Sequence, residues 1–261
     1  MINIQLLNSY IKHWLTAKTR HGTHSPFVYK LVDEVIYDYS PRDDFQEIEQ
    51  LRKLLLSDER YITITDLGAG SHVNNNKRKQ VKQLAKNALK PSKLAQLIYR
   101  LSNELNPGNI IELGTCLGLT TSYLARSAPK ARVISIEGCP ETAAIARENL
   151  DSLKVVNSNI LTGNFDTVFP EVLSGMDRLD FVFIDGNHRK QATLDYFHLC
   201  LPKVHEGSLL IFDDIYWSKG MQEAWDEIKA HPEVTVTVDL FWIGLVYFRK
   251  GQVKEDFKIR F

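Results

Sequence analysis

The chain has 261 residues, 44% of them hydrophobic, which is enough for one large globular domain or for a core domain with an appendage. Its 32 basic and 32 acidic residues give a formal net charge of zero, so the composition disfavours nucleic acid and an acidic membrane surface as partners. Cys116, Cys139 and Cys200 are scattered and no apolar run approaches the length of a membrane span, so we expect no disulfide framework, no thiolate metal site and a cytoplasmic protein.

Residues 2–60 show the apolar spacing of helices. One stripe covers residues 6–15, another covers residues 27–36, and "FQEIEQLRKLLL" predicts a third helix. Pro26 after Ser25 indicates a helix start with the serine as its cap. The neighbouring His21 and His24 leave two interpretations open. The segment packs as an ordinary helix start, which we favour, or it covers a substrate and the histidines belong to the site.

The stretch "ITITDLGAGS", residues 62–71, has the pattern of a strand followed by an acid and a Gly-x-Gly turn. No amphipathic helix opens directly after its glycines, so the turn lacks the free amides and positive dipole end that would bind an anionic group. Two helical patterns, "VKQLAKNAL" and "SKLAQLIYRLSNEL", precede the next apolar strand. We therefore expect a loop or short strand in an appendage, followed by a mobile segment "SHVNNNKRK" that closes over the cofactor. Asp66, Ser71 and His72 are secondary candidates on the substrate side.

From residue 109 the pattern alternates between apolar strands and amphipathic helices. Continuous apolar strands between helices predict a mostly parallel sheet covered on both faces. The last two strands follow each other without a helix, so we expect an antiparallel pair at the end of the sheet. The seven expected strands are "NIIELG", "RVISIE", "LKVVNS", "LDFVFID", "GSLLIFDD", "VTVTVDL" and "IGLVYFRK".

The turn "ELGTCLG" reads Glu-x-Gly-x-x-x-Gly and lacks the middle glycine that a dinucleotide site needs beside its pyrophosphate. This spacing is typical of sites for S-adenosylmethionine (SAM), which has no pyrophosphate. The next strand ends in Glu137, where a carboxylate can accept the ribose hydroxyls. The alternative is a strand-to-helix turn whose glycines only permit close packing.

Two acidic clusters follow later strands, "FIDGNH" with Asp185 and His188, and "IFDDIYW" with Asp213 and Asp214. Both clusters stand at the carboxyl ends of expected parallel strands, where such sheets bind ligands. Three carboxylates this close repel one another unless a cation neutralises them, and oxygen ligands suit Mg²⁺, Ca²⁺ or Mn²⁺. The alternative is that Asp185 contacts only the cofactor or caps a helix, and that the aspartate pair forms a capping turn.

Taken together, "IIELGTCLGLTTSYLA", "VISIEGCP", "GNF", "FVFIDGNH", "LLIFDDIYW" and "GLVYFRK" resemble the class I SAM-dependent methyltransferases. Within that family the chain is most similar to O-methyltransferases of the catechol and caffeoyl-coenzyme A type. The resemblance covers residues 93–261, and it implies a Rossmann-like α/β fold with a seven-stranded sheet and an antiparallel last strand. Residues 1–92 would then be a helical appendage that serves as a lid.

The resemblance implies a role for each matching residue of the cofactor site. Glu112 and Gly114 would line the methionine end of SAM, Thr120 would bind its carboxylate, and Glu137 would bind its ribose. Asn164 and Phe165 would flank the adenine, although an acidic or small residue is usual at the position of Asn164. The cofactor-binding residues implied are Glu112, Gly114, Thr115, Gly118, Thr120, Glu137, Gly138, Asn164, Phe165 and Asp185.

The resemblance also implies methylation of a hydroxyl of a small molecule. Asp185, Asp213 and Asp214 match metal ligands of the family, and the cation there lowers the pKa of the acceptor hydroxyl. The family's basic lysine has no clear match, so His188 is our candidate for the base.

Other activities stay open: a metal-independent small-molecule N-methyltransferase, a noncatalytic SAM-binding module and, less favoured, a nicotinamide oxidoreductase. The sequence identifies neither the acceptor nor the oligomeric state, for which a homodimer is one candidate.

Overall fold

A computed structural model describes residues 4–22, 24–65 and 78–261 of the chain. These residues form two compact units, a terminal unit of Met1–Asp38 with Met176–Phe261 and a central unit of Tyr39–Gly175. The expected division at residue 92 into appendage and methyltransferase domain stays a prediction. Among the residues that the structure describes, none of the helices combines the length and apolarity that a membrane span requires.

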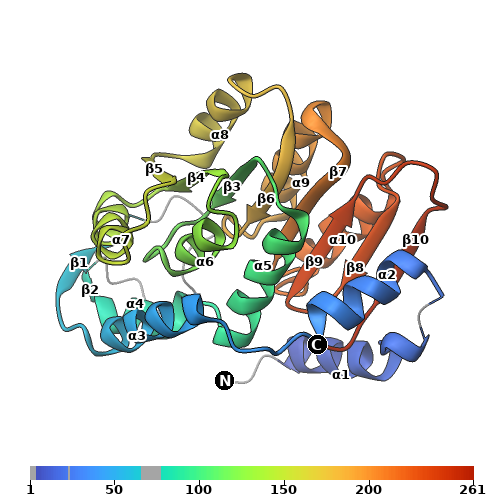
Figure 1. The fold of residues 1–261 in the computed structure, drawn as a ribbon, viewed down its shortest axis with the longest axis horizontal. Coiled ribbons are helices and arrows are strands. Elements are labelled where there is room, and N and C mark those ends of the chain that lie inside the picture. The colour runs from blue at the N-terminus through green and yellow to red at the C-terminus, as the bar shows by residue number, and fades with distance from the viewer. Residues whose placement is uncertain (1–3, 23, 66–77) are drawn as a thin grey trace. The chain divides into compact units, whose positions relative to one another are not determined.

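The central unit contains three parallel strands, in the order β3, β4, β5 (Figure 1). Leu113 pairs with Ile136 and Glu137 pairs with Thr162, so the three strands end at the same edge. The strands are β3 Asn109–Leu113, β4 Arg132–Glu137 and β5 Ser158–Thr162. The helices are α3 Asp43–Ser57, α4 Val81–Ala88, α5 Ser92–Leu105, α6 Leu119–Ser127, α7 Pro140–Ser152 and α8 Phe165–Ser174.

The apolar stripe predicted for α3 packs against α6 and against the turn before it. Ile48 and Leu51 belong to the same buried cluster as Leu117, Leu119 and Tyr123, and four of these five side chains are at most 2% exposed while Leu51 is 6% exposed. Each such side chain contributes roughly 1.5–3 kcal/mol when it leaves water. The third predicted helix therefore braces the glycine turn of β3.

The first glycine stretch contributes a short hairpin to the central unit. Strand β1, Tyr61–Thr63, pairs antiparallel with β2, Arg78–Gln80, and β2 lies beside α4 (Figure 1). The backbone N–H of Thr63 donates to Glu141 Oε2 at 2.7 Å, which attaches the hairpin to the first turn of α7. The expected short strand is confirmed. Asp66, Ser71, His72 and the proposed closure over the cofactor lie outside the described residues.

The strands of the terminal unit run in the order β10, β8, β9, β7, β6. Strands β6 and β7 are parallel, and β9 is antiparallel to both β7 and β8, which confirms the expected antiparallel pair. The strands are β6 Leu179–Ile184, β7 Val204–Asp213, β8 Val236–Asp239, β9 Ile243–Tyr247 and β10 Glu255–Lys258. The helices are α1 Ile4–Thr16, η1 Arg20–Gly22, α2 Pro26–Lys30, η2 Leu31–Ile36, α9 Lys190–Cys200, η3 Leu201–Lys203 and α10 Lys219–Ala230.

The helix start at Pro26 is confirmed. The Ser25 hydroxyl accepts a hydrogen bond from the backbone N–H of Val28 at 3.4 Å, and Pro26 occupies the first helical turn. The helix continues into η2 as a π-helix, so the apolar stripe predicted for residues 27–36 is shared between two helical forms. Val28 and Val32 on this stripe are fully buried.

Two strand predictions differ from the structure. We expected a strand over "LKVVNS", but β5 begins at Ser158, and Val156 is 93% exposed. Val155 donates instead to Leu150 O at 3.0 Å and Lys154 has a φ of 55°, so this segment closes the end of α7. Strand β10, which pairs parallel with β8, was not expected, because "EDFK" is too polar to show strand alternation.

Candidate functional site

The turn between β3 and α6 has an unusual backbone. Gly114, Cys116 and Gly118 have φ values of 102°, 50° and 77°. The N–H of Gly114 donates to Ile136 O at 2.9 Å, which holds the turn against the end of β4. Because left-handed backbone is costly for residues other than glycine, the two glycines and the strained Cys116 fit a turn shaped for a ligand.

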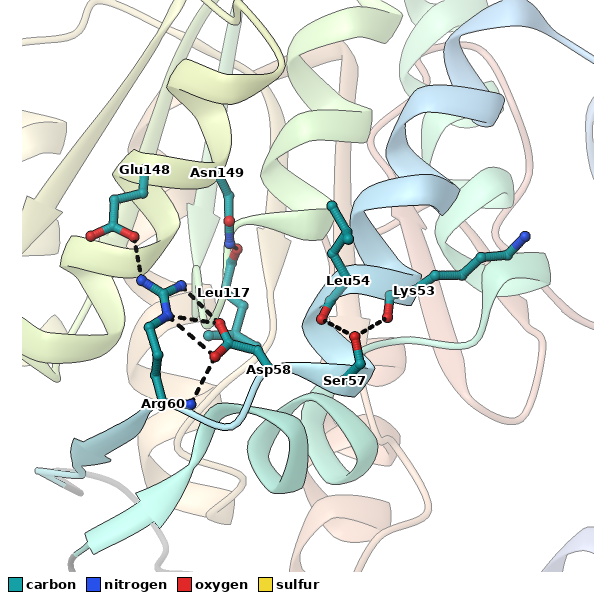
Figure 2. Close-up of polar contacts among 8 residues, drawn as sticks. All are labelled: Lys53, Leu54, Ser57, Asp58, Arg60, Leu117, Glu148 and Asn149. Atoms are coloured by element: carbon teal, nitrogen blue, oxygen red, sulfur yellow. Dashed lines mark hydrogen bonds and ion pairs between the residues drawn. The ribbon is translucent and has the colours of Figure 1, made fainter.

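Helix α7 holds the far side of this turn. A Cβ on Gly118 would lie 3.1 Å from the Cβ and 3.2 Å from the carbonyl oxygen of Ala146, so the helix approaches too closely for another residue. The Asn149 amide donates to Leu117 O at 2.8 Å, a contact drawn in Figure 2. Arg60 lies between Asp58 and Glu148 in the same view and links the start of the hairpin to α7. Helix α7 therefore supports the turn through Ala146 and Asn149.

The Glu137 carboxylate lies at the carboxyl ends of β3 and β4. Its Oε2 accepts from the N–H of Cys116 at 2.8 Å and its Oε1 accepts from the N–H of Cys139 at 2.9 Å. The Glu137 side chain is half-buried, as is Gly138. Helix α7 begins at Pro140, two residues after Gly138. The structure thus brings Glu137 to the glycine turn, as predicted.

Glu112 is more buried than a residue in contact with a cofactor would need to be. Its exposure is 0%, and its Oε2 accepts from the hydroxyls of Thr121 and Ser135, the latter at 2.6 Å. The hydroxyl of Ser135 also bonds that of Thr115. This network fixes the base of the turn. The predicted contacts of Glu112, Thr115 and the 8% exposed Thr120 with SAM stay predictions.

The predicted adenine position lies at the end of the third strand. Asn164 caps α8, where its Oδ1 accepts from the N–H of Asp166 at 3.0 Å, and Phe165 is the first residue of that helix. Asn164 is exposed and Phe165 is half-buried. Glu137 pairs with Thr162, two residues before Asn164. The central unit thus gathers the glycine turn, Glu137 and Asn164 at the ends of three adjacent strands.

In the terminal unit, Asp185, His188 and Asp213 form a cluster that can hold a metal ion. Each offers a ligand atom, and these atoms all lie within 4.8 Å of one another. Asp185 follows β6 and Asp213 ends β7, and the pairing of Ile184 with Phe212 places the two aspartates side by side. Two carboxylates and an imidazole suit a divalent cation such as Mn²⁺, so this donor set fits the expected metal.

Asp214 and His188 stand beside each other at this cluster. His188 Nε2 lies 3.8 Å from Asp185 Oδ1 and 3.9 Å from Asp214 Oδ2, too far for direct hydrogen bonds. Asp214 has a φ of 53°, so its backbone is strained where the loop leaves β7. The Lys190 ammonium group, two residues after His188, pairs with Glu223 and Glu227 at 3.0 and 2.7 Å. His188 therefore remains our candidate for the base.

His21 and His24 are the two site candidates of the segment before Pro26. His24 is exposed beside the helix cap Ser25, and the side chain of His21 lies outside the described part of the structure. Their assignment to the site stays a prediction.

A pocket of about 750 Å³ lies at the opposite end of the central strands. It is lined by α3, by the end of α6 and by residues 152–157, which precede β5. The pocket is therefore separate from the edge that carries Glu137.

Sequence reasoning missed a buried polar network in the terminal unit. His13 and Asp239 are 4% and 2% exposed, and His13 Nε2 lies 3.1 Å from Asp239 Oδ1. Tyr216 donates its hydroxyl to Asp239 Oδ2 at 2.7 Å. Burial raises the pKa of Asp239, but the hydrogen bonds from His13 and Tyr216 outweigh it, so the pKa lies below its usual value. No local pattern connects residues 226 positions apart.

Comparison with known proteins agrees with this geometry. A family model described as a methyltransferase domain matches residues 111–215. A catechol O-methyltransferase of Niastella koreensis is 32% identical over 126 residues, which cover 47% of this chain and 55% of that protein. A probable O-methyltransferase of Mycobacterium tuberculosis is 32% identical over 154 residues, 51% of this chain and 65% of that protein. The chain therefore spans only about half to two thirds of the length of these relatives.

Solved structures show the fold. An O-methyltransferase of Bacillus cereus in complex with S-adenosylhomocysteine (SAH) has a TM-score of 0.57 at 19% identity. The match covers 85% of this chain and 99% of that chain. A SAH-bound methyltransferase of Podospora anserina has a TM-score of 0.60 at 10% identity, covering 87% and 98%. This chain therefore shares its Rossmann-like α/β fold with these two structures.

Proposed function

We propose that this chain, which resembles the SAM-dependent O-methyltransferases, transfers a methyl group from SAM to a hydroxyl of a small molecule with the help of a divalent cation. The observation that carries the proposal is the cluster of Asp185, His188 and Asp213 within 4.8 Å. This cluster supports hydroxyl methylation, which profits from a cation, over a fold that only binds SAM.

The central unit would bind the cofactor. Glu137 would offer carboxylate oxygens to the ribose, and the turn from Gly114 to Gly118 would line the methionine end. Asn164 and Phe165 would flank the adenine. These assignments rest on the adjacent ends of β3, β4 and β5 and on the family resemblance.

The terminal unit would prepare the acceptor. Asp185 and Asp213, with Asp214 or His188, would hold the cation, which binds a hydroxyl and lowers its pKa. Methyl transfer to oxygen requires the hydroxyl to lose its proton, and a neutral imidazole accepts a proton near physiological pH. If His188 is a ligand, it cannot also serve as the base, so the two roles are alternatives for the same side chain.

Calorimetry tests the cofactor assignment. We expect the full chain to bind SAM and S-adenosylhomocysteine and not NAD, because the turn lacks the glycine that a pyrophosphate requires. Turnover with a panel of catechols and other hydroxyl compounds, with and without EDTA, then tests the reaction. Absence of binding to either SAM or S-adenosylhomocysteine would refute every methyltransferase interpretation.

The same experiments separate the alternatives. Turnover of amines that survives EDTA would favour a metal-independent N-methyltransferase, and tight SAM binding without turnover of any acceptor would favour a noncatalytic module. A cytoplasmic location and a homodimer stay proposals that rest on the composition.

A further inference from the structure

The loop that carries the candidate metal ligands is attached to the turn between β8 and β9. Asp213 is the last residue of β7 and pairs with Ile243 at the start of β9. The N–H of Asp214 donates to Trp242 O at 2.8 Å, and the N–H of Trp217 donates back to Asp214 O at 2.9 Å. The position of the Asp214 carboxylate therefore depends on the position of the β8–β9 turn.

That turn is itself strained and held by Asp239. Phe241 has a φ of 71°, which is rare for an aromatic residue and costs of order 1–3 kcal/mol. Asp239 Oδ1 accepts from the N–H of Phe241 at 2.9 Å, and the ring of Phe241 stacks on Tyr216 with centroids 4.7 Å apart. The hydroxyl of Tyr216 returns to the same carboxylate. Asp239 thus joins the strained turn to the metal-ligand loop.

His13 completes the surroundings of Asp239 from helix α1. Its Nε2 lies 3.1 Å from Asp239 Oδ1 and 3.2 Å from the Asp239 carbonyl oxygen. Its ring meets Tyr216 and Phe241 edge to face, with centroids 6.0 and 5.6 Å apart. Removing the imidazole would leave a buried carboxylate without one of its donors and a gap beside the stacked rings of Tyr216 and Phe241.

We propose that His13 is a positioning residue for the candidate cation site, acting through Asp239 and Tyr216 on the loop of Asp213 and Asp214. The inference rests on the proposed function, because it presupposes that this loop binds a cation. Helix α1 would then support the cation site from behind through His13, instead of covering the substrate as a lid.

A matched control exists in the same unit. His205 Nε2 lies 2.9 Å from Asp180 Oδ1, and Asp180 is 4% exposed. This second histidine–aspartate pair joins the early residues of β6 and β7, at the other end of these strands from Asp185 and Asp213. Its loss should lower stability without disturbing the cation loop.

The experiment measures Mn²⁺ binding to the full chain by electron paramagnetic resonance of free Mn²⁺. We expect His13→Ala to weaken binding roughly 10-fold or more, as changes behind metal ligands do. Tyr216→Phe removes a single oxygen and should weaken binding in the same direction to a smaller degree. His205→Ala should stay within about twofold of the wild type, because distant sites are additive. Circular dichroism fixes a temperature at which each variant is folded.

The outcomes separate the inference from the proposed function. Mn²⁺ binding by His13→Ala and Tyr216→Phe at wild-type strength would overturn the inference alone, as would equal weakening by His205→Ala. Wild-type chain that binds no Mn²⁺ would overturn both the cation role and the inference. If His13→Ala does not fold, Tyr216→Phe against His205→Ala decides the question.

Discussion

Two glutamates near the carboxyl ends of neighbouring strands have different surroundings. Glu112 is fully buried and accepts hydroxyl donors from Thr121 and Ser135, whereas Glu137 is half-buried and accepts two backbone N–H groups. A half-buried carboxylate at the edge can accept a ribose hydroxyl, whereas the fully buried Glu112 supports the turn through its hydroxyl donors. The difference makes Glu137 the stronger candidate for direct contact with a cofactor.

The lowered pKa of a third glutamate, Glu49, predicts that the free energy of unfolding depends on pH. Burial raises the pKa of Glu49, but hydrogen bonds from Tyr123 and Ser92 and the contact with Arg52 outweigh it, so its pKa lies below the usual value. A lowered pKa in the folded state stabilises the fold above the unfolded pKa of about 4.3, and this contribution is lost as the pH falls through the folded pKa. Glu49→Gln should cost about 1–3 kcal/mol at pH 7.

Urea unfolding at pH 7 and at pH values below 4 checks this sign. The difference between wild type and Glu49→Gln should shrink at the acid end. Glu59→Gln is the control, because Glu59 is 77% exposed and its ion pair with Lys82 lies at the surface. A difference that is constant with pH would show that the Glu49 charge does not contribute.

Among single residues, the sequence predicts those whose role depends on neighbours within the same strand or turn. The Ser25 cap, the glycines of the β3 turn and the acid at the end of β4 follow from spacing within one strand or turn. The contact of His13 with Asp239 depends on how α1 packs against β8, and it has no local signature. The grouping of Asp185 with Asp213 was predictable because parallel neighbouring strands end at one edge.

Elements were predictable where apolar periodicity was strong. The helices that the structure describes in the central unit, and the buried strands β3, β4 and β6, follow from their apolar patterns. The strand predicted for "LKVVNS" was wrong, because its two valines suggest a strand but the end of α7 occupies this segment. Strand β10 has one buried residue, Phe257, and its polar sequence becomes a strand by pairing with the edge of β8. A local helix end decided the first case, and tertiary pairing decided the second.

A substitution at Gly118 tests how tightly the turn before α6 packs against α7. Gly118→Ala would place a Cβ in left-handed backbone and 3.1 Å from the Cβ of Ala146. The backbone and the overpacking together should cost roughly 2–4 kcal/mol. Affinity for S-adenosylhomocysteine should fall as well, since the turn cannot keep its position against α7.

Gly251→Ala separates the two contributions to this cost. Gly251 has a similar φ of 72°, but a Cβ there would meet no atom within 4 Å. It should lose only about 1 kcal/mol from the backbone. Thermal unfolding of both variants measures the difference, and equal losses would show that α7 yields to the extra methyl group.

For the molecule as a whole, the two compact units carry different candidate chemistry. The central unit holds the glycine turn and Glu137, and the terminal unit holds Asp185, His188 and Asp213. Each group of residues is assembled within its own unit, from adjacent strand ends. Cofactor binding and cation binding should therefore be separable by single substitutions.

Glu137→Gln and Asp213→Asn test this separation as a reciprocal pair. Loss of a charged hydrogen-bond acceptor costs about 1.5–3 kcal/mol, or roughly 10- to 100-fold in affinity. Glu137→Gln should weaken the binding of S-adenosylhomocysteine by this factor and leave the affinity for Mn²⁺ unchanged, because Glu137 belongs to the central unit and the cation cluster to the terminal unit. Asp213→Asn should do the reverse, and both should lose turnover. If Asp213→Asn weakens the cofactor as strongly as the cation, Asp213 serves SAM directly, and the assignment of cation binding to the terminal unit fails.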